Sequence, residues 1–249
     1  MREDDALRIN LYLSRAGICS RREADVLVSE GRVTIDGKTA GSGCKVMPGQ
    51  VVCLDGRPVG TPEKKVILAV NKPRGVVCTT DRRWGDRILE DLVDCSERVF
   101  SAGRLDKDSE GLILMTNQGD LVDRIMRSSH GHEKEYIVTV DHEVDEPFLA
   151  RLGQGVFLPE LGVKTRPCKV RKTGSREFHM ILTQGLNRQI RRMCRTCGYK
   201  VVRLIRIRIM NICLGDLPVG KWRYLTQQET KDLYALSRMR RERDGKERI

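Results

Sequence analysis

The sequence predicts an α+β fold in two domains, a small N-terminal domain at residues 1–60 and a larger domain at residues 66–236. Three observations support this prediction. The first domain combines signals for helices with a signal for a β-hairpin. Residues 58–65 are rich in proline, glycine and charge, which is typical of a linker. Short apolar strands and amphipathic helices follow, up to a charged tail at residues 237–249 that we expect to be disordered.

The N-terminal domain is expected to contain two helices and a small sheet. Residues 7–16 carry apolar side chains at helical spacing. Residues 20–23, Ser-Arg-Arg-Glu, form a capping-box pattern, which opens a second helix that ends near Gly31. Residues 33–39 alternate around an Asp-Gly pair, which is the strongest short-range signal for a hairpin.

The second helix is predicted to carry Arg21 and Arg22 in its first turn. Positive charge at this position opposes the helix dipole and is destabilising. A phosphate backbone that docks on this turn would offset that effect, because helix N-termini attract phosphate. Two exposed arginines are also tolerated at little cost, and this pair alone does not decide between the two interpretations.

The larger domain is expected to begin with a strand at residues 66–70, which cannot continue through Pro73. Its further elements are predicted as strands at residues 112–115, 136–140 and 203–212 and as helices at residues 120–127 and 187–197. Asn187 is predicted to cap the last of these helices at its start, and Gly198 to close it.

The composition is typical of a soluble globular protein, because 32% of the residues are charged and 39% are hydrophobic. The longest aliphatic run, at residues 66–70, is too short to span a bilayer. The first residues are acidic, and no apolar stretch of signal-peptide type follows them. We therefore expect a cytoplasmic protein.

The nine cysteines are expected to be reduced thiols in that compartment. Cys194 and Cys197 have the spacing of metal ligands, but no second pair of this kind accompanies them. Together with Ile190 and Met193 they recur at helical spacing, which favours one buried helix face. A calcium-loop pattern that begins at Asp106 lacks the final carboxylate of such loops. The sequence therefore predicts no metal site.

The net charge of +12 favours a nucleic-acid partner, and the excess lies in one stretch. Residues 162–213 contain fourteen lysines and arginines but one acidic residue, Glu177. Such a stretch can be a solvated face, but solvated faces usually mix charges of both signs, so we expect it to bind phosphate. In the strand at residues 203–212, alternation places Arg206 and Arg208 on one face, which we expect to meet RNA, and isoleucines on the opposite, core face.

Residues 103–112, Gly-Arg-Leu-Asp-Lys-Asp-Ser-Glu-Gly-Leu, place Asp106 among cationic residues and just before an apolar run. Arg104 and Lys107 are expected to keep the pKa of this carboxyl low, so that the carboxylate can act as a nucleophile or a base. An aspartate that pairs with Arg104 or Lys107 in a structural turn would give the same pattern. These residues alone neither decide between the two interpretations nor name a reaction.

The chain also carries longer motifs. In the large domain they are Asn71-Lys72-Pro73-x-Gly75, Gly103-Arg104-Leu105-Asp106-x4-Gly111-Leu112, Lys134-x-Tyr136 and Gln184-Gly185-x-Asn187-Arg188-Gln189-Ile190-Arg191-Arg192-Met193. Together they resemble the motifs of the RsuA family of pseudouridine synthases, and most of all those of its RluF-type ribosomal RNA enzymes. Residues 8–33 are similar to a small RNA-binding domain of the ribosomal-protein-S4 (alpha-L) type.

This resemblance implies a mixed, largely antiparallel sheet with flanking helices and a central cleft. It implies that Asp106 is the catalytic aspartate, that Tyr136 lines the target base, and that Arg191 pairs with Asp106. The implied reaction converts uridine into pseudouridine. In this isomerisation the bond from N1 to C1′ breaks, the base turns, and C5 bonds to C1′. The resemblance implies that no cofactor and no metal are needed.

The charge distribution and the resemblance together predict which basic residues contact RNA. They are Arg8, Arg21, Arg22, Arg32, Lys72, Arg104, Arg188, Arg192, Arg206 and Arg208. We expect the partner of a monomeric enzyme to be a stem-loop of large-subunit (23S) ribosomal RNA, with a transfer RNA stem-loop as the alternative. A non-catalytic RNA-binding or ribosome-assembly factor would explain the charge, but it has no need of Asp106, Tyr136 and Arg191.

Overall fold

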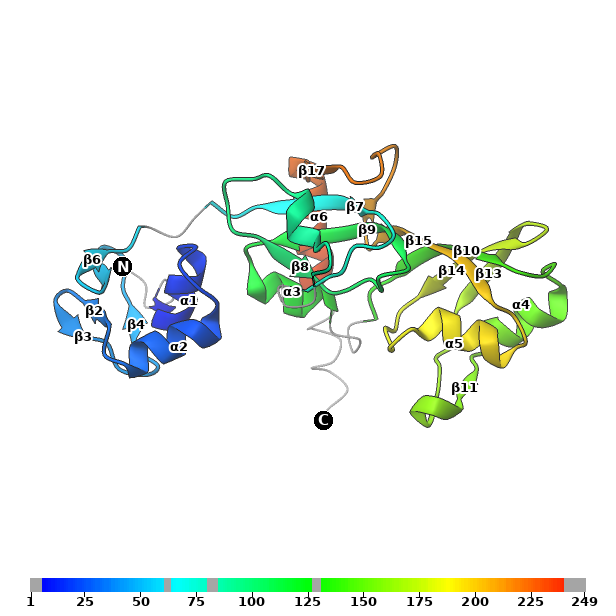
Figure 1. The fold of residues 1–249 in the computed structure, drawn as a ribbon, viewed down its shortest axis with the longest axis horizontal. Helices are drawn as coiled ribbons and strands as arrows, with labels where there is room; N and C mark the ends of the chain where they lie inside the picture. Colours follow the sequence, from blue (N-terminus) through cyan, green and yellow to red (C-terminus); the bar gives the residue numbers. More distant parts are fainter. Residues whose placement is uncertain (1–5, 61–63, 80–84, 127–130, 240–249) are drawn as a thin grey trace. The chain divides into compact units, whose positions relative to one another are not determined.

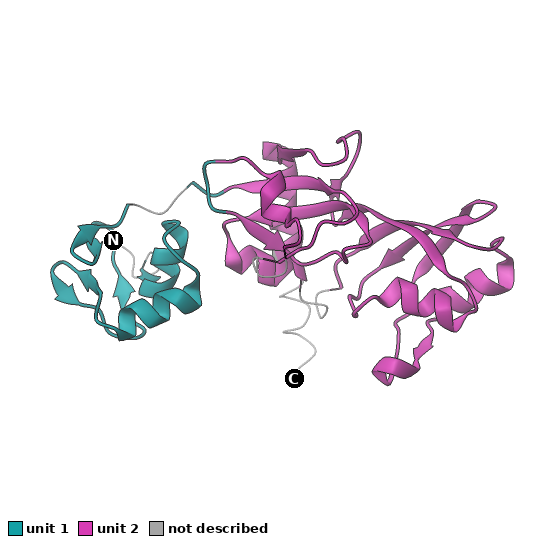
Figure 2. Ribbon diagram, viewed as in Figure 1, with its two compact units in different colours: residues 1–65, 96–98 teal, residues 66–95, 99–249 magenta. Residues whose placement is uncertain are grey.

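The computed structural model of the protein describes residues 6–60, 64–79, 85–126 and 131–239. The chain divides into two compact units (Figure 2). Unit 1 comprises residues 1–65 and 96–98, and unit 2 comprises residues 66–95 and 99–249. Each unit has its own hydrophobic core, so each is described separately.

Unit 1 packs two helices against short strands. Its elements are β1 (Leu7–Arg8), α1 (Ile9–Arg15), α2 (Arg21–Ser29), β2 (Val33–Ile35), β3 (Lys38–Thr39), β4 (Lys45–Val46), β5 (Val52–Leu54) and β6 (Arg57–Pro58) (Figure 1). Strands β3, β2, β5 and β6 form an antiparallel sheet in that order. Leu13 and Ala24 of the helices pack with Val33 and Val52 of the sheet in a buried cluster.

Two local signals of the sequence are confirmed in unit 1. Ser20 Oγ accepts the backbone N–H of Glu23 at 3.3 Å, and Glu23 Oε2 accepts that of Ser20 at 2.7 Å, which is the predicted capping box. The helix ends just before Gly31, whose φ is +69°. Asp36 and Gly37 join β2 to β3 with φ angles of +48° and +77°, as the tight turn of a two-residue hairpin requires.

Unit 2 is built on one sheet flanked by helices. Its strands are β7 (Ile67–Lys72), β8 (Phe100–Ala102), β9 (Glu110–Thr116), β10 (Lys134–Val140), β11 (Phe157–Leu158), β12 (Val163–Lys164), β13 (Lys169–Gly174), β14 (Glu177–Leu182), β15 (Val201–Ile209), β16 (Ile212–Cys213) and β17 (Trp222–Tyr224). Its helices are the 3-10 turns η2 (Leu89–Leu92) and η4 (Pro159–Leu161) and the α-helices α3 (Gly119–Met126), α4 (Glu146–Gly153), α5 (Gln189–Thr196) and α6 (Gln227–Met239).

The main sheet has the strand order β13-β14-β10-β15-β9-β7-β17, with β16 on β15 and β8 on β9. Strands β9 and β15 pair in parallel, whereas the other pairings described in this sheet are antiparallel. The mixed, largely antiparallel sheet and the α+β class are therefore confirmed. The short strands β11 and β12 form a separate hairpin.

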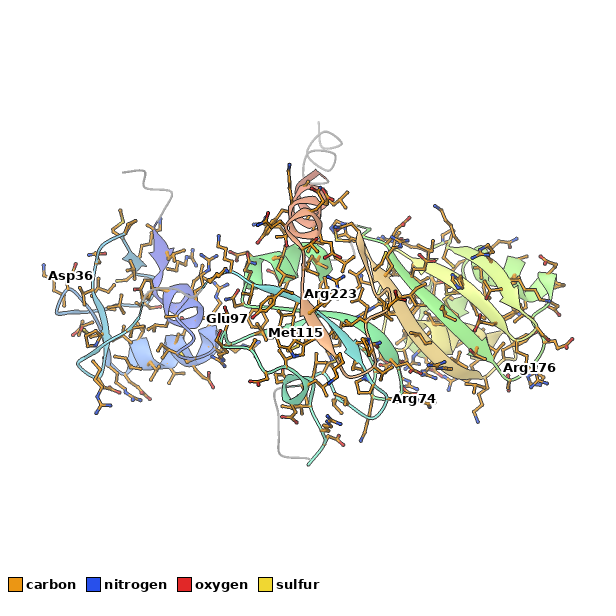
Figure 3. All side chains as sticks on the ribbon, turned by 90° about the horizontal axis from the view of Figure 1, so that it is seen from above. Asp36, Arg74, Glu97, Met115, Arg176 and Arg223 are labelled. Carbon is orange, nitrogen blue, oxygen red and sulfur yellow. The ribbon has the colours of Figure 1, made fainter. Side chains whose placement is uncertain are left out.

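The core of unit 2 lies on both faces of the sheet. Strands β7 and β9 are buried along their whole length, with Leu68 in one hydrophobic cluster and Ala69 in the other. Helices α4 and α5 contribute to the first cluster, and α3 and α6 to the second. Met115 of β9 is fully buried, whereas Arg176, at the turn from β13 to β14, is exposed (Figure 3). Among the described helices, none is long and apolar enough to cross a membrane.

The start of α5 differs from the prediction. The residue that precedes the helix is Arg188, in the left-handed region with φ +49°, and not Asn187. The oxygens of Asn187 have another role, because its backbone carbonyl and its side-chain carbonyl accept N–H groups of Arg192 at 3.0 and 3.1 Å. The end of the helix is as predicted, with Cys197 as the last cap residue before Gly198.

The predicted disordered tail is wrong at its first residues. Helix α6 continues to Met239, and Ser237 is buried, because this helix packs on the sheet through the fully buried Leu233. Residues 240–249 lie outside the described part of the chain.

The predicted alternation along β15 is also wrong. Arg206 pairs with Tyr136 of β10 and Arg208 with Glu135, so β15 has one residue more than β10 between these two pairs. Such a bulge shifts the alternation by one residue. Arg206 and Arg208 therefore point to opposite faces of the sheet, and the single arginine face expected from the sequence does not exist.

Candidate active site

A pocket of about 410 Å³ opens in unit 2 where the turn between β8 and β9 meets β10, β15 and the start of α5. The ionisable side chains that line it are Arg104, Asp106, Lys134, Tyr136, Arg188 and Arg206. These residues are far apart in the sequence, but β10, β15 and β9 are neighbours in the sheet. The sheet order therefore brings the predicted catalytic turn next to the predicted aromatic residue.

The turn that carries Asp106 is held by its own backbone. The N–H of Ser109 donates to the carbonyl of Asp106 at 3.0 Å, and the N–H of Gly75 donates to the carbonyl of Lys107 at 2.7 Å. The side chain of Asp106 keeps 31% of its surface exposed. Its carboxylate is thus presented by a fixed turn and remains accessible, which suits a nucleophile or a base.

Arg188 connects the start of α5 to this turn. Its guanidinium donates to both carboxylate oxygens of Asp108 at 3.1 Å and lies 3.8 Å from Oδ2 of Asp106. Burial acts to raise the pKa of Asp108, but the hydrogen bonds from Arg188 and the charge of Arg191 outweigh it and lower this pKa below its usual value. Asp108 is therefore ionised at neutral pH and anchors the arginines of α5.

Arg191 has a different partner from the one expected. Its Nε lies 3.3 Å from Oδ2 of Asp108, and its Nη2 donates to the carbonyl of Asp108 at 2.9 Å and to Ser109 Oγ at 3.3 Å. Its Nη1 donates to the carbonyl of Val201 on β15 at 3.2 Å. The expected pairing of Arg191 with Asp106 is thus corrected. Arg191 binds this turn two residues beyond Asp106, at Asp108, and connects it to β15.

Replacing Arg191 with methionine should lower the free energy of unfolding by about 2–3 kcal/mol, because two carbonyl groups and the carboxylate of Asp108 would lose a charged donor in a half-buried site. Urea denaturation would measure this change. Arg195→Met is the matched control, since Arg195 lies one turn further on the same helix, is 65% exposed and pairs with Glu160. It should change the stability by less than about 0.5 kcal/mol, and equal losses for both variants would contradict the anchoring role.

Lys72 does not lie where an RNA contact requires it. Its side chain is completely buried, and its Nζ donates to the carbonyl groups of Pro73 at 2.9 Å and Val76 at 2.8 Å. Burial lowers the pKa of this ammonium group. The predicted RNA contact by Lys72 is therefore wrong, and the residue instead holds the loop that follows β7.

Several other predicted RNA contacts are engaged within the protein. Arg208 pairs with Glu133 at 3.0 Å and with Glu135 at 2.9 Å, and Arg206 is 2% exposed. Arg192 pairs with Glu160, and Arg32 pairs with Asp55 at 2.6 Å and with Glu30 at 3.3 Å. The exposed members of the predicted set are Arg8, Arg21, Arg22, Arg32, Arg104 and Arg188. Contacts of these residues with RNA stay a prediction.

Lys134 is a pocket residue that the sequence did not single out. It is 6% exposed and lies two residues before Tyr136 on β10, so both side chains point to the same face of the strand. Burial and the nearby charge of Arg206 lower the pKa of Lys134 to about 8. The signal was present in the motif Lys134-x-Tyr136, because period-two spacing on a strand predicts a shared face.

The described residues contain no group of three or more His, Cys, Asp and Glu side chains that could hold a metal ion. Ile190, Met193 and Cys194 form a buried stripe on α5, as expected, and Cys197 is partly buried beside them. The pocket offers a carboxylate, an aromatic ring and several cations. This set suits a planar, polar substrate that carries phosphate.

Comparison with known proteins gives the family. Residues 66–196 match the family model of the RNA pseudouridylate synthases, and residues 7–52 match the S4 domain. The chain is 49% identical over 238 residues to the "Dual-specificity RNA pseudouridine synthase RluF" of Escherichia coli K12, which covers 95% of this chain and 81% of that protein. It is 38% identical over 234 residues to an "Uncharacterized RNA pseudouridine synthase" of Aquifex aeolicus, covering 92% of this chain and 94% of that one.

A solved structure described as a pseudouridylate synthase superimposes with a TM-score of 0.67 at 29% identity, over 91% of this chain and 99% of that one. This agreement covers both the S4 domain and the synthase domain. The resemblance inferred from the motifs is confirmed, and the chain belongs to the family of RNA pseudouridylate synthases.

Proposed function

We propose that this enzyme isomerises a uridine to pseudouridine in a stem-loop of large-subunit (23S) ribosomal RNA, with Asp106 as the catalytic aspartate. The observation that carries the proposal is the pocket, in which an accessible carboxylate on a fixed turn faces the same space as Tyr136. The pocket volume of about 410 Å³ is large enough for a single nucleoside.

The target uridine has to leave its base stack to reach Asp106. Unstacking costs a few kcal/mol, which contacts between cationic side chains and phosphates offset. Tyr136, 9% exposed at the pocket wall, can stack on the extruded base. Arg188 and Arg191 are proposed to position Asp106, because both bind Asp108 in the turn that carries it.

RNA recognition is proposed to involve the exposed arginines of both units. Arg21 and Arg22 are exposed in the first turn of α2, and Arg8 is exposed in β1. Arg104 is exposed at the rim of the pocket. Phosphate contacts of this kind fix the register of a protein on RNA without reading its sequence.

The Escherichia coli relative is named a dual-specificity enzyme. The second candidate substrate that we propose for this chain is a transfer RNA stem-loop. A purely RNA-binding role is disfavoured, since binding alone would not require an accessible carboxylate and an aromatic ring inside a pocket. The enzyme is proposed to act in the cytoplasm as a monomer.

The test compares RNA from cells with and without this protein by mapping pseudouridine at single-nucleotide resolution. A site in 23S ribosomal RNA that is lost without the protein is the expected result. The purified protein should then release tritium from a matching stem-loop labelled at uridine C5. If only a site in transfer RNA is lost, transfer RNA is the substrate and 23S ribosomal RNA is not. If the pseudouridine maps are the same with and without the protein, the proposed activity is rejected.

A further inference from the structure

Two buried cations line one wall of the pocket, and no carboxylate of the described residues pairs with either of them. Lys134 on β10 is 6% exposed and Arg206 on the neighbouring strand β15 is 2% exposed. Both line the same cavity as Asp106. The strand register pairs Arg206 with Tyr136, and Lys134 lies two residues from Tyr136, so the two cations share the face of the sheet that carries the aromatic ring.

Arg206 differs from the other arginines of β15 in its partners. Arg203 pairs with Glu110 and Arg208 with two glutamates. Arg206 has no acidic partner within the described parts of the chain; its Nε donates to the carbonyl of Leu112 at 2.7 Å. Its Nη2 is buried and has no hydrogen-bond partner among the described residues.

An unpartnered donor on a buried guanidinium is unfavourable, and an entering acceptor relieves that penalty. Lys134 is buried beside this guanidinium, and burial and the charge of Arg206 lower the pKa of its ammonium group to about 8. At neutral pH most of this group still carries its proton. The pocket therefore holds preformed positive charge where a substrate oxygen can bind.

The proposed reaction generates negative charge that such a site can bind. When the bond between C1′ and N1 breaks, both electrons remain on the uracil, and its negative charge is shared by N1, C5 and the carbonyl oxygens O2 and O4. The ring then turns, and C5 supplies the electron pair for the new bond to C1′. The proton on C5 leaves and N1 takes up a proton, so the isomerisation needs no other reactant.

We propose that Lys134 and Arg206 stabilise the detached, anionic uracil by donating hydrogen bonds to its carbonyl oxygens. This inference rests on the proposed function and deepens it. Fixed donors aimed at charge that develops during a reaction typically contribute about 10²–10³-fold to the turnover rate each. Because the neutral base of the bound substrate carries less charge than the detached uracil, the two residues should lower the barrier more than they strengthen RNA binding.

A phosphate of the target nucleotide is the other anionic group that could bind here. A phosphate is charged before and during the reaction, so its contact would appear in the dissociation constant and in its dependence on salt. Contact with the uracil anion would appear in kcat. The two sources of negative oxygen can therefore be separated by measurement.

The experiment compares Lys134→Met and Lys134→Arg with wild type and with Lys231→Met, a change of an exposed lysine on α6. The readouts are tritium release from the substrate stem-loop labelled at uridine C5, RNA affinity at several salt concentrations, and thermal unfolding. We expect kcat of Lys134→Met to fall about 10²-fold, with RNA affinity within about twofold of wild type and an unchanged salt slope. Lys231→Met should match wild type.

The pH profile gives a second readout. In wild type the cationic form of Lys134 is lost as pH rises through about 8, so kcat should fall there. Lys134→Arg keeps its charge, and its profile should lack this step. The other charged or titratable groups that line the pocket are Arg104, Asp106, Tyr136 and Arg188.

Weaker binding with a reduced salt slope and an unchanged kcat in Lys134→Met would assign the site to a phosphate and overturn the proposal. A wild-type kcat in that variant would also overturn it. If Lys134→Met does not fold, the profile of Lys134→Arg decides, and an unchanged step near pH 8 counts against the proposal. Failure of the proposed function would look different, because wild type itself would then release no tritium.

Discussion

Replacing Asp106 with asparagine should reduce turnover by a factor on the order of 10⁴ while RNA still binds. Asparagine keeps the shape of the side chain but is neither a nucleophile nor a base. The fold should tolerate the change, because the turn is held by the backbone hydrogen bond from Ser109 to Asp106, which remains. The one ion pair described for Asp106, with Arg188, is long at 3.8 Å and partly exposed, so little stability depends on it.

The measurement is tritium release from stem-loop RNA labelled at uridine C5, under single-turnover conditions. Asp108→Asn provides the comparison within the same turn. Asp108 holds Arg188 and Arg191, so its loss should lower stability and reduce turnover moderately, by about 10–100-fold, without abolishing it. If Asp106→Asn turned over within tenfold of wild type, or if Asp108→Asn lost more turnover than Asp106→Asn, Asp106 would not be the catalytic aspartate.

Local sequence signals predicted local structure well in this protein. The capping box at Ser20 and the hairpin turn at Gly37 depend on residues that are neighbours in the chain, and both formed as predicted. The turn that carries Asp106 could also be located, because a segment bounded by glycines and containing Asp106 among cationic residues precedes an apolar strand. What the segment does was named by its resemblance to a family, since neither charge nor spacing specifies a reaction.

Predictions that depend on pairing between distant segments were the ones that failed. The bulge in β15 arises from its register with β10, and it placed Arg206 in the pocket and Arg208 on the opposite face. Lys72 is buried because the loop after β7 folds back over it, which no periodicity in that segment reveals. Arg191 pairs with Asp108 instead of Asp106, and this depends on how α5 meets the turn before β9, which lies far away in the sequence.

Replacing Gly111 with alanine should destabilise unit 2 by more than about 3 kcal/mol. Gly111 has φ +101°, a conformation that residues with a Cβ rarely adopt. It also lies against Arg206 where β9 and β15 pair in parallel, and an added Cβ would overlap the backbone nitrogen and oxygen of Arg206. Backbone strain and steric overlap would therefore both destabilise the folded state of the Gly111→Ala protein.

The same substitution should reduce turnover more than the loss of folded protein explains, because the turn that leads into β9 and the strand β15 both line the pocket. Asp106 lies five residues before Gly111, and Arg206 is the residue that the new methyl group would displace. Gly185→Ala is the control for stability, since a Cβ there meets no atom within 4 Å and the residue lines the same pocket. Urea denaturation should show a change of less than about 1 kcal/mol for Gly185→Ala. If the Gly111→Ala protein were as stable as wild type, β9 could move away from β15 without strain. The close approach of these strands would then not fix the distance between the turn that carries Asp106 and Arg206.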